Sequence, residues 1–217
     1  MDSVNERLFS KQEADLLFEI ILNRRDVRGN RFSKRSLEDE KVNKILLAGV
    51  NAPSVGFSQP WEFVLIKDTK IKEQIKGTFN EENEKAIPKF NDKKQEEYKR
   101  LKLEGIFEAP LNIAIFYAGT DKPVLGQTSM TEVGLYSVVC AIQNMWLMAR
   151  ALNIGMGWVS IIDPGKVKQI LKAPENNKLV GYFCLGYTTG FLKQPELELL
   201  KWKSRKEMSE MIFNDTY

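Results

Sequence analysis

The sequence predicts a single domain of the α+β class, with helices and strands mixed along the chain. Its 217 residues, 43% of them hydrophobic, are enough for one substantial core and too few for two. Residues 131–152 are almost continuously apolar and contain no proline, which predicts a helix about 33 Å long. Shorter apolar runs at 111–117 and 179–187 are typical of buried strands. We therefore expect one core built around the long helix.

Apolar side chains cover nearly the whole circumference of the 131–152 helix, so packing partners must surround it. Gln143, Asn144 and Arg150 interrupt the apolar run before the roughly 18 residues that a membrane span needs. The helix is therefore expected to lie inside a soluble protein, and no membrane partner is predicted.

The other elements follow from capping residues and from apolar periodicity. Ser10 and Glu13 have the spacing of a capping box, and Thr128 or Ser129 is expected to cap the long helix. Residues 153–155 would end that helix in a left-handed turn. The expected helices are 11–23, 36–50, 68–79, 131–152 and 163–171, and the expected strands are 63–66, 111–117, 158–162 and 179–187.

Two segments stand apart from this core. Residues 80–100 are very polar, which is typical of a solvated helical excursion. Their sparse apolar residues and the following segment 101–106 would also let residues 80–106 close over a site as a lid. Residues 193–217 are charged but carry Trp202. A tryptophan on a protruding tail needs cover, so this extension is expected to wrap a second subunit.

Composition excludes several functions. Thirty-two basic and 29 acidic residues leave a net charge of +3, with the two signs interspersed, so nucleic acid is a poor partner and small-molecule chemistry is favoured. The polar residues 1–6 lack the apolar segment of a secretion signal, which predicts a cytoplasmic protein. Cys140 and Cys184 lie in apolar contexts without metal spacing and are expected to be inert core residues.

The chain contains no histidine. This absence excludes Ser-His-Asp and Cys-His catalysis as well as imidazole metal sites. Any difficult electron chemistry would therefore have to come from a bound organic cofactor, and no metal is expected.

The strongest candidate site follows the first helix. Arg24, Arg25 and Arg28 suit capture of a phosphate or carboxylate by guanidinium groups, although a solvated basic turn explains them equally well. Asp26 among them either pairs with the arginines structurally or is held ionised by them for chemistry.

Two further places offer hydrogen-bonding groups. Ser160 lies within the expected strand 158–162 and is either a satisfied core serine or a ligand contact, with position alone favouring the core serine. The loop 51–61 carries Ser54, Ser58 and Gln59, which suit a polar heterocycle, but a simple connector would also use its prolines and glycine.

Taken together, several segments resemble the nitroreductase-like flavoproteins, and more closely their 5,6-dimethylbenzimidazole synthase branch. The resemblance covers most of the chain, and it departs at Gln127, where an arginine is expected, and at Glu62, where a basic residue often stands. The matching segments are residues 24–28 (RRDVR), 52–56 (APSVG), 59–61 (QPW), 101–106 (LKLEGI) and 157–160 (GWVS).

The resemblance implies a central, mostly antiparallel sheet surrounded by helices, in an intertwined homodimer whose two sites lie at the interface. It also implies the activity, in which reduced FMN is consumed as a substrate with molecular oxygen to give 5,6-dimethylbenzimidazole, the lower ligand of vitamin B12, and erythrose 4-phosphate. Asp26 and Ser160 become the expected catalytic residues. The expected flavin-binding residues are Arg24, Arg25, Asp26, Val27, Arg28, Ser54, Leu103, Ser160 and Arg205.

Two other functions stay open at this stage. The first is a nitroreductase or flavin reductase that keeps FMN and cycles it with NAD(P)H. The second is a non-catalytic flavin carrier or sensor. A separate flavin reductase would be a further partner of the synthase, because the synthase consumes flavin that is already reduced.

Overall fold

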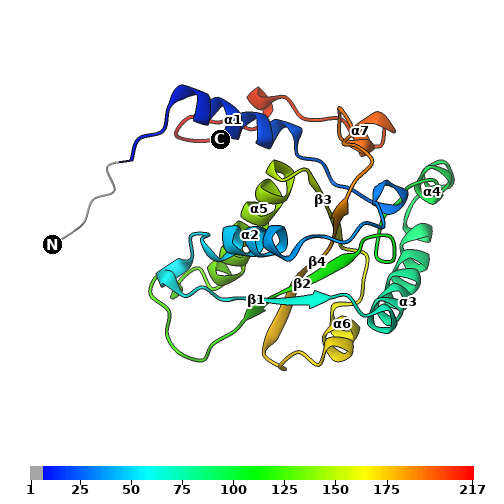
Figure 1. Cartoon of the computed structure of the whole chain (residues 1–217), viewed down its shortest axis with the longest axis horizontal. Coiled ribbons are helices and arrows are strands. Elements are labelled where there is room, and N and C mark those ends of the chain that lie inside the picture. The colour runs from blue at the N-terminus through cyan, green and yellow to red at the C-terminus, as the bar shows by residue number, and fades with distance from the viewer. Residues whose placement is uncertain (1–6) are drawn as a thin grey trace.

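The computed structural model describes residues 7–217, which form a four-stranded antiparallel sheet with helices on both faces (Figure 1). The α+β class is therefore confirmed. Residues 1–6, on which the expectation of a cytoplasmic protein rests, lie outside the described part. The strands in spatial order are β1 (Trp61–Ile66), β2 (Leu111–Ala118), β4 (Asn177–Tyr187) and β3 (Ile154–Val159).

The helices confirm most of the expected elements. The expected helix 68–79 runs on to Ala86, because residues 80–86 contain no proline or glycine and Pro88 is the first helix breaker. The α-helices are α1 (Lys11–Asn23), α2 (Asp39–Val50), α3 (Thr69–Ala86), α4 (Asp92–Lys99), α5 (Val133–Ala151), α6 (Pro164–Leu171) and α7 (Glu196–Leu199). Short 3₁₀ turns are Gly29–Arg31, Val55–Phe57, Ile87–Lys89 and Met208–Glu210.

The core has two layers of apolar side chains, one on each face of the sheet. Successive side chains of a strand point to opposite faces. Leu111, Ile113 and Ile115 of β2 therefore pack with α2 and α5, whereas Ala114 and Phe116 pack with α3 and α6. Figure 1 shows the sheet between these two pairs of helices. Because β2 is covered on both faces, its sequence is continuously apolar rather than alternating.

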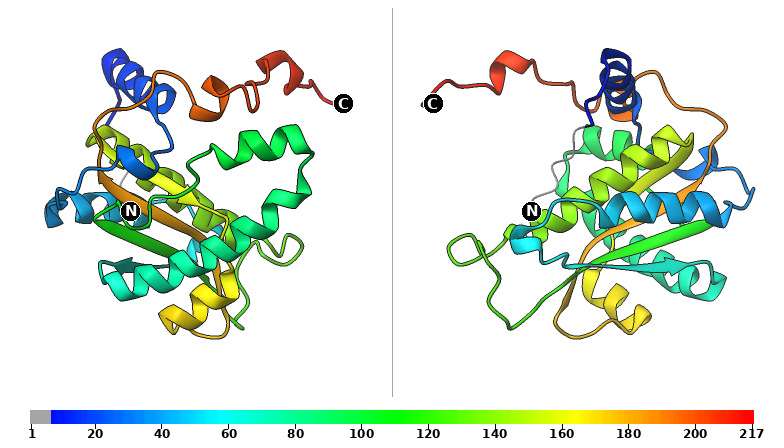
Figure 2. Two further views of the ribbon diagram at one scale, coloured as in Figure 1. Left: turned by 90° about the vertical axis from the view of Figure 1, so that its right-hand side faces the viewer. Right: turned by 60° about the vertical axis from the view of Figure 1, so that its left-hand side comes forward.

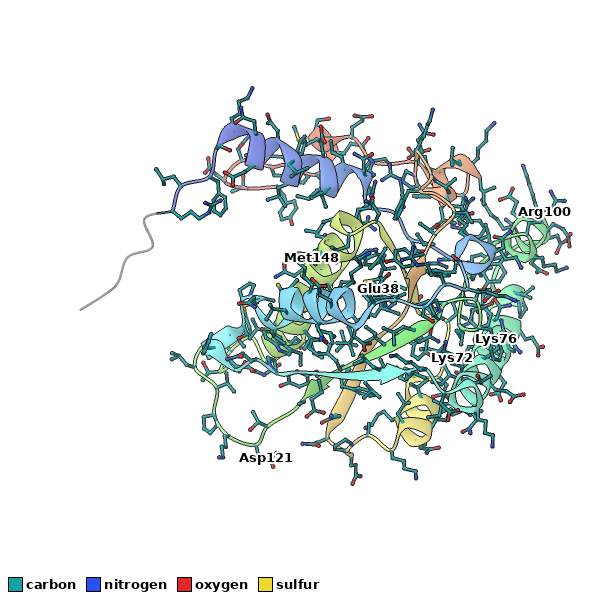
Figure 3. The ribbon with its side chains drawn as sticks, in the orientation of Figure 1. Glu38, Lys72, Lys76, Arg100, Asp121 and Met148 are labelled. Atoms are coloured by element: carbon teal, nitrogen blue, oxygen red, sulfur yellow. The ribbon has the colours of Figure 1, made fainter. Side chains whose placement is uncertain are left out.

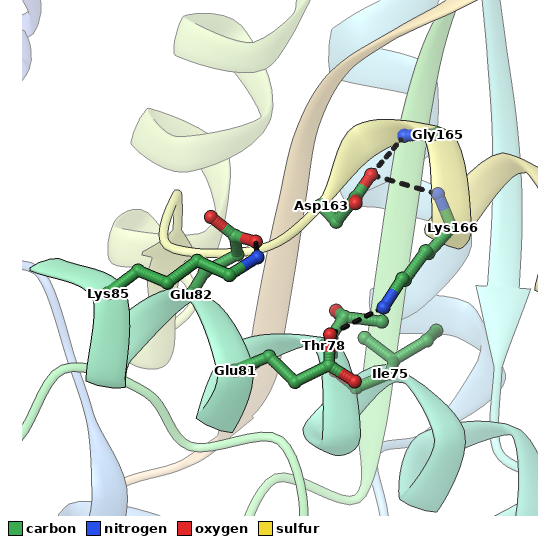
Figure 4. A network of polar contacts seen from close by, with 8 residues as sticks. All are labelled: Ile75, Thr78, Glu81, Glu82, Lys85, Asp163, Gly165 and Lys166. Carbon is green, nitrogen blue, oxygen red and sulfur yellow. Dashed lines mark hydrogen bonds and ion pairs between the residues drawn. The ribbon is translucent and has the colours of Figure 1, made fainter.

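Helix α6 begins at a side-chain cap, and it contacts α3 through an ion pair and through buried apolar side chains (Figure 4). The Asp163 carboxylate accepts hydrogen bonds from the backbone N–H groups of Gly165 (2.8 Å) and Lys166 (3.0 Å). The Lys166 ammonium pairs with Glu81 of α3 at 2.5 Å. This exposed ion pair adds little stability, so the buried apolar contacts do most to hold the two helices together.

The strand after α5 begins earlier than the sequence indicated. It spans Ile154–Val159 rather than 158–162, and Ser160 is an exposed residue just beyond its end. Ser160 is therefore not a strand residue, and the core serine, which position alone favoured over a ligand contact, is wrong. Asn153 does adopt the expected left-handed conformation (φ 56°). The chain becomes extended directly after it, because Gly155 and Gly157 serve as strand residues that leave room for a neighbouring segment.

The N-terminus of α5 also differs from the expectation. Its N-cap is Glu132, which makes no side-chain cap hydrogen bond, so Thr128 and Ser129 do not cap the helix. Instead, Gln127 donates from its side-chain amide to the carbonyl of Thr131 (3.0 Å) and to the Tyr117 hydroxyl (3.3 Å). The capping box of Ser10 with Glu13, in contrast, is confirmed.

Much apolar surface stays exposed on the described chain. Helix α1 has no buried residue, although it carries Leu16, Leu17 and Phe18. Helix α5 leaves Tyr136 exposed, together with Cys140, so the expectation of a core position for Cys140 was wrong; Cys184 is buried as expected. Figure 2 shows the C-terminal segment extending beyond the body of the subunit. Among residues 7–217, no helix is long and apolar enough to span a bilayer.

Candidate active site

A hollow of about 760 Å³ lies where the end of α1 meets the segments 101–103 and 193–205. Its volume is in the range of about 300–1,000 Å³ that is typical of small-molecule sites. The lining residues are Ile21, Leu22, Arg24, Arg25, Asp26, Arg28, Leu101, Lys102, Leu103, Gln143, Lys193, Gln194, Pro195, Glu196, Leu197, Glu198 and Arg205.

The segment after α1 reaches the hollow because it runs along the edge of β3. Arg150 of α5 donates to the carbonyl of Asn23 at 2.9 Å, which holds the end of α1. The Val27 N–H then donates to the carbonyl of Met156 at 3.1 Å. A Cβ at Gly157 would lie 2.0 Å from the Val27 carbonyl oxygen, so only glycine permits this approach. Val27 is itself buried behind the hollow rather than lining it.

The Asp26 carboxylate is held at both oxygens. Oδ1 accepts a hydrogen bond from the backbone N–H of Trp158 at 2.9 Å, and Oδ2 accepts from Nε of Arg28. Burial raises the pKa of Asp26, while Arg28, the Trp158 N–H and Arg24 act in the opposite direction. A half-buried carboxyl whose pKa is raised and which lines a hollow is a candidate for proton transfer.

The other arginines form a cationic wall. The Arg24 guanidinium lies over the Trp146 ring, 4.8 Å from its centre, while Arg25 donates to the carbonyls of Leu22 (2.7 Å) and Lys193 (2.5 Å). Burial lowers the pKa of Arg24 and of Arg25, and the positive charge of Arg205 lowers both further. Within the described chain, Nε of Arg25 is buried without a hydrogen-bond partner.

The segment after α4 closes one side of the hollow and is anchored to α3. Figure 3 labels Lys72 and Lys76, which project from α3. Lys72 donates to the carbonyl of Ala109 at 2.7 Å, and Lys76 pairs with Glu104 at 2.7 Å. Burial lowers the pKa of Lys72. These contacts fix the chain just beyond Leu103, so Leu103 lines the hollow from a supported position.

The C-terminal segment also lines the hollow, and it contacts α4. The Trp202 ring packs edge-on against Phe90, with 5.4 Å between ring centres, and lies 6.4 Å from Tyr98. The Lys94 ammonium lies over the same Trp202 ring at 4.4 Å. Trp202 is therefore partly covered within its own chain, and the wrapping of this extension around a second subunit stays a prediction.

The structure brings six of the predicted site residues together and leaves three outside the lining. Ser160 lies beyond the end of β3, and the hydroxyl of Ser54 accepts from the Gln59 N–H at 3.1 Å in the loop before β1. Val27 is the third. The six that line the hollow are Arg24, Arg25, Asp26, Arg28, Leu103 and Arg205.

Sequence reasoning did not select Gln143, although it lines the hollow. Gln143 is a polar residue within the apolar stretch 131–152, and this pattern could have marked it as a candidate ligand contact. Glu62, one of the departures from the family pattern, accepts a hydrogen bond from Asn177 at 2.6 Å and so serves a contact between strands. Within residues 7–217, no group of three or more acidic, cysteine or histidine residues could hold a metal ion.

Comparison with known proteins agrees with this architecture. A family model described as "Nitroreductase family" matches residues 21–187. A 5,6-dimethylbenzimidazole synthase of Rhodospirillum rubrum is 42% identical over 92% of this chain and 94% of its own length. A second protein of that name, from Rhodobacter capsulatus, is 32% identical over 90% of this chain and 94% of its own length.

Solved structures share the fold. An iodotyrosine deiodinase bound to FMN and 3-iodo-L-tyrosine superposes with a TM-score of 0.73 at 21% identity, covering 93% of this chain and 100% of that one. A BluB-like flavoprotein from Clostridium difficile gives 0.69 at 21% identity, covering 92% and 99%. The chain therefore belongs to the nitroreductase family, and within it to the 5,6-dimethylbenzimidazole synthases.

Proposed function

We propose that this protein fragments reduced FMN with molecular oxygen to 5,6-dimethylbenzimidazole and erythrose 4-phosphate, and so supplies the lower ligand of vitamin B12. The observation that carries the proposal is the pairing, in one hollow, of a cationic wall with a half-buried carboxylate held at both oxygens. The similarity to two proteins named 5,6-dimethylbenzimidazole synthase supports the same reaction.

The cationic wall fits the phosphate of FMN. Burial lowers the pKa of Arg24 and of Arg25, and the positive charge of Arg205 lowers the pKa of both further; an anion bound beside these guanidinium groups would relieve that repulsion. The buried Nε of Arg25 has an unused N–H, and a phosphate oxygen is a suitable acceptor for it. The residues present therefore fit a phosphate ester at this end of the hollow.

The chemistry divides between the flavin and the protein. Reduced FMN supplies the reactivity toward oxygen when it is bound. In our proposal Asp26 holds or moves a proton at its carboxylate, and Leu103 covers the site against water. Ser160, which is exposed just beyond the end of β3 and does not line the hollow, would donate or accept a hydrogen bond beside the reacting part of a flavin that extends past the hollow. No histidine is needed for these roles.

Product analysis distinguishes the proposed synthase from the alternatives. FMN would be reduced anaerobically with the protein, oxygen admitted, and the products identified by mass spectrometry. The synthase yields 5,6-dimethylbenzimidazole in stoichiometric relation to the flavin lost. A flavin reductase or nitroreductase would return intact oxidised FMN and consume NAD(P)H, and a carrier would return intact flavin without turnover. Supplying reduced flavin from a separate reductase should sustain repeated turnover by the synthase.

We also propose that the active form is a homodimer. The exposed apolar faces of α1 and α5 need cover, and a partner subunit of the same chain would supply it. Ser54, which lies outside the hollow of its own subunit, would then be available to the partner's hollow.

The dimer proposal predicts a concentration-dependent assembly. Light scattering at micromolar concentration should give twice the mass of one chain. Removal of residues 198–217 should weaken both association and FMN binding, because Trp202 and Arg205 are lost together. A monomer in the full-length protein would contradict the proposal.

Arg24→Ala should weaken FMN binding more than riboflavin binding. The two ligands differ in the phosphate, and a hydrogen bond to a charged group is worth about 1.5–3 kcal/mol, or roughly tenfold to a hundredfold in affinity. Flavin fluorescence titration measures both dissociation constants. Equal losses for the two ligands would place Arg24 away from the phosphate.

A further inference from the structure

Arg28 has a different set of partners from Arg24 and Arg25. Each of its three nitrogens donates within the protein: Nε to Asp26, Nη1 to the carbonyl of Leu103 at 3.0 Å, and Nη2 to the carbonyl of Trp158 at 3.3 Å. Its side chain is 22% exposed. Because the guanidinium is planar and rigid, these three contacts fix its plane and leave little freedom to turn toward a ligand.

These contacts form a closed ring with the Asp26 carboxylate. The backbone of Trp158 donates to Oδ1 of Asp26 at 2.9 Å and also accepts from Nη2 of Arg28. Nε of Arg28 in turn donates to Oδ2 of Asp26. A rotation of the carboxylate would break one or both of its hydrogen bonds, so its orientation is set by Arg28 and by β3 together.

The same guanidinium reaches the segment that closes the hollow. Leu103, whose carbonyl accepts from Arg28, lines the hollow, and the next residue, Glu104, accepts from the Gly29 N–H through its carbonyl at 2.8 Å. Glu104 is also paired with Lys76 of α3. Arg28 thus joins the carboxylate to an anchored part of the 101–104 segment.

We propose that Arg28 is a positioning residue, which fixes the Asp26 carboxylate and couples it to the segment 101–104, rather than a ligand of the phosphate. The inference relies on the proposed function only for the identity of the reaction that Asp26 serves. In this proposal Arg28 holds the Asp26 carboxylate, whereas Arg24 and Arg25 face the phosphate.

The charges around Asp26 give this proposal a measurable consequence. Arg24 and Arg28 favour the ionised carboxylate, as does the backbone N–H of Trp158 from β3. From β4 the nearby titratable group is Cys184, whose pKa is raised by burial, so its thiol stays neutral. Removal of the Arg28 charge should therefore raise the pKa of Asp26, because a neighbouring positive charge favours the ionised carboxylate.

The test compares Arg28→Gln, Arg28→Lys and Arg24→Gln in the full-length protein. Flavin fluorescence gives the dissociation constants of FMN and riboflavin. NMR titration of ¹³C-labelled aspartate, assigned with Asp26→Asn, gives the pKa of the Asp26 carboxyl. The benzimidazole formed from reduced FMN and oxygen is measured against pH.

In Arg28→Gln we expect the preference for FMN over riboflavin to change by less than about twofold, whereas Arg24→Gln should reduce it tenfold to a hundredfold. The pKa of Asp26 should rise in Arg28→Gln, and the part of the pH profile that Asp26→Asn abolishes should move to higher pH with it. Arg28→Lys should return the pKa toward its original value but leave product formation reduced, since one ammonium cannot replace the planar three-contact arrangement.

Two results would overturn the inference: a loss of FMN preference in Arg28→Gln equal to that in Arg24→Gln, or an unchanged pKa of Asp26. Failure of the proposed function has a different signature, because the unsubstituted protein would then form no benzimidazole. In that case the pKa of Asp26 in Arg28→Gln still decides the matter, a rise supporting the positioning role and no change overturning it.

Discussion

Asp26→Asn should bind FMN nearly as well as the unsubstituted protein but form about a hundredfold to ten-thousandfold less 5,6-dimethylbenzimidazole. The amide keeps the size of the carboxylate and an oxygen that can accept from the Trp158 N–H. It cannot hold or release a proton, and general acid or base groups typically contribute this factor. Oxygen should still reoxidise the flavin, so flavin oxidation and benzimidazole formation become uncoupled. Mass spectrometry and flavin absorbance measure the two outcomes separately.

A matched control is Asp163→Asn. Asp163 caps α6, away from the hollow, and asparagine is an equally good N-cap, so neither stability nor product formation should change. Benzimidazole formation by Asp26→Asn at the original rate would mean that Asp26 serves only as an ion-pair partner of Arg28. Loss of FMN binding in Asp26→Asn would instead assign it a structural role.

Gly157→Ala should displace the segment 26–28 from β3 and so disrupt the site. The added Cβ would lie 2.0 Å from the carbonyl oxygen of Val27, and a backbone atom cannot rotate away as a flexible side chain can. The segment 26–28 would have to leave the edge of β3, losing the bond from Val27 to Met156 and the bond from Trp158 to Asp26. We expect the free energy of unfolding to fall by about 1–3 kcal/mol, and FMN affinity to fall at least tenfold.

Gly77→Ala is the control for a glycine substitution as such. Gly77 lies inside α3 with no atom within 4 Å of the position of an added Cβ. Alanine there should raise the free energy of unfolding by about 0.5–1 kcal/mol and leave FMN binding unchanged. Urea unfolding and flavin titration on both variants make the comparison. A Gly157→Ala protein as stable as the unsubstituted one would show that the segment 26–28 can shift without cost.

The parts of the fold that local chemistry determines could be predicted from the sequence. Ser10 and Glu13 form their capping box, Asp163 caps α6, and the apolar runs of β2 and β4 are strands. In these cases the determining residues lie within a few positions of one another. The start of β3 could not be predicted in this way. Gly155 and Gly157 are needed there because residue 27, which is far away in the sequence, packs directly against them.

In the candidate site, too, the features set by neighbouring residues could be predicted, whereas those set by distant residues could not. A cluster of arginines around Asp26 is visible in the sequence, and the structure brings most of the cluster to one hollow. The separate partners of Arg24 and Arg28 are not visible, because Trp146, Leu103 and Trp158 come from distant parts of the chain. Residue type therefore predicted an anion site, while tertiary contacts decide which guanidinium is free to serve it.

The packing of Trp202 against Phe90 and Tyr98 has a consequence for product exit. Helix α4 and the C-terminal segment share this aromatic contact, so α4 cannot swing outward without breaking it or taking the tail along. Arg205 lies shortly after Trp202 and lines the hollow. Opening would then withdraw a positive charge from the phosphate end at the moment when a phosphorylated fragment has to leave. In the proposed reaction, a lid that opened in this way would also weaken the electrostatic attraction for the phosphorylated product, and so would lower the barrier to its release.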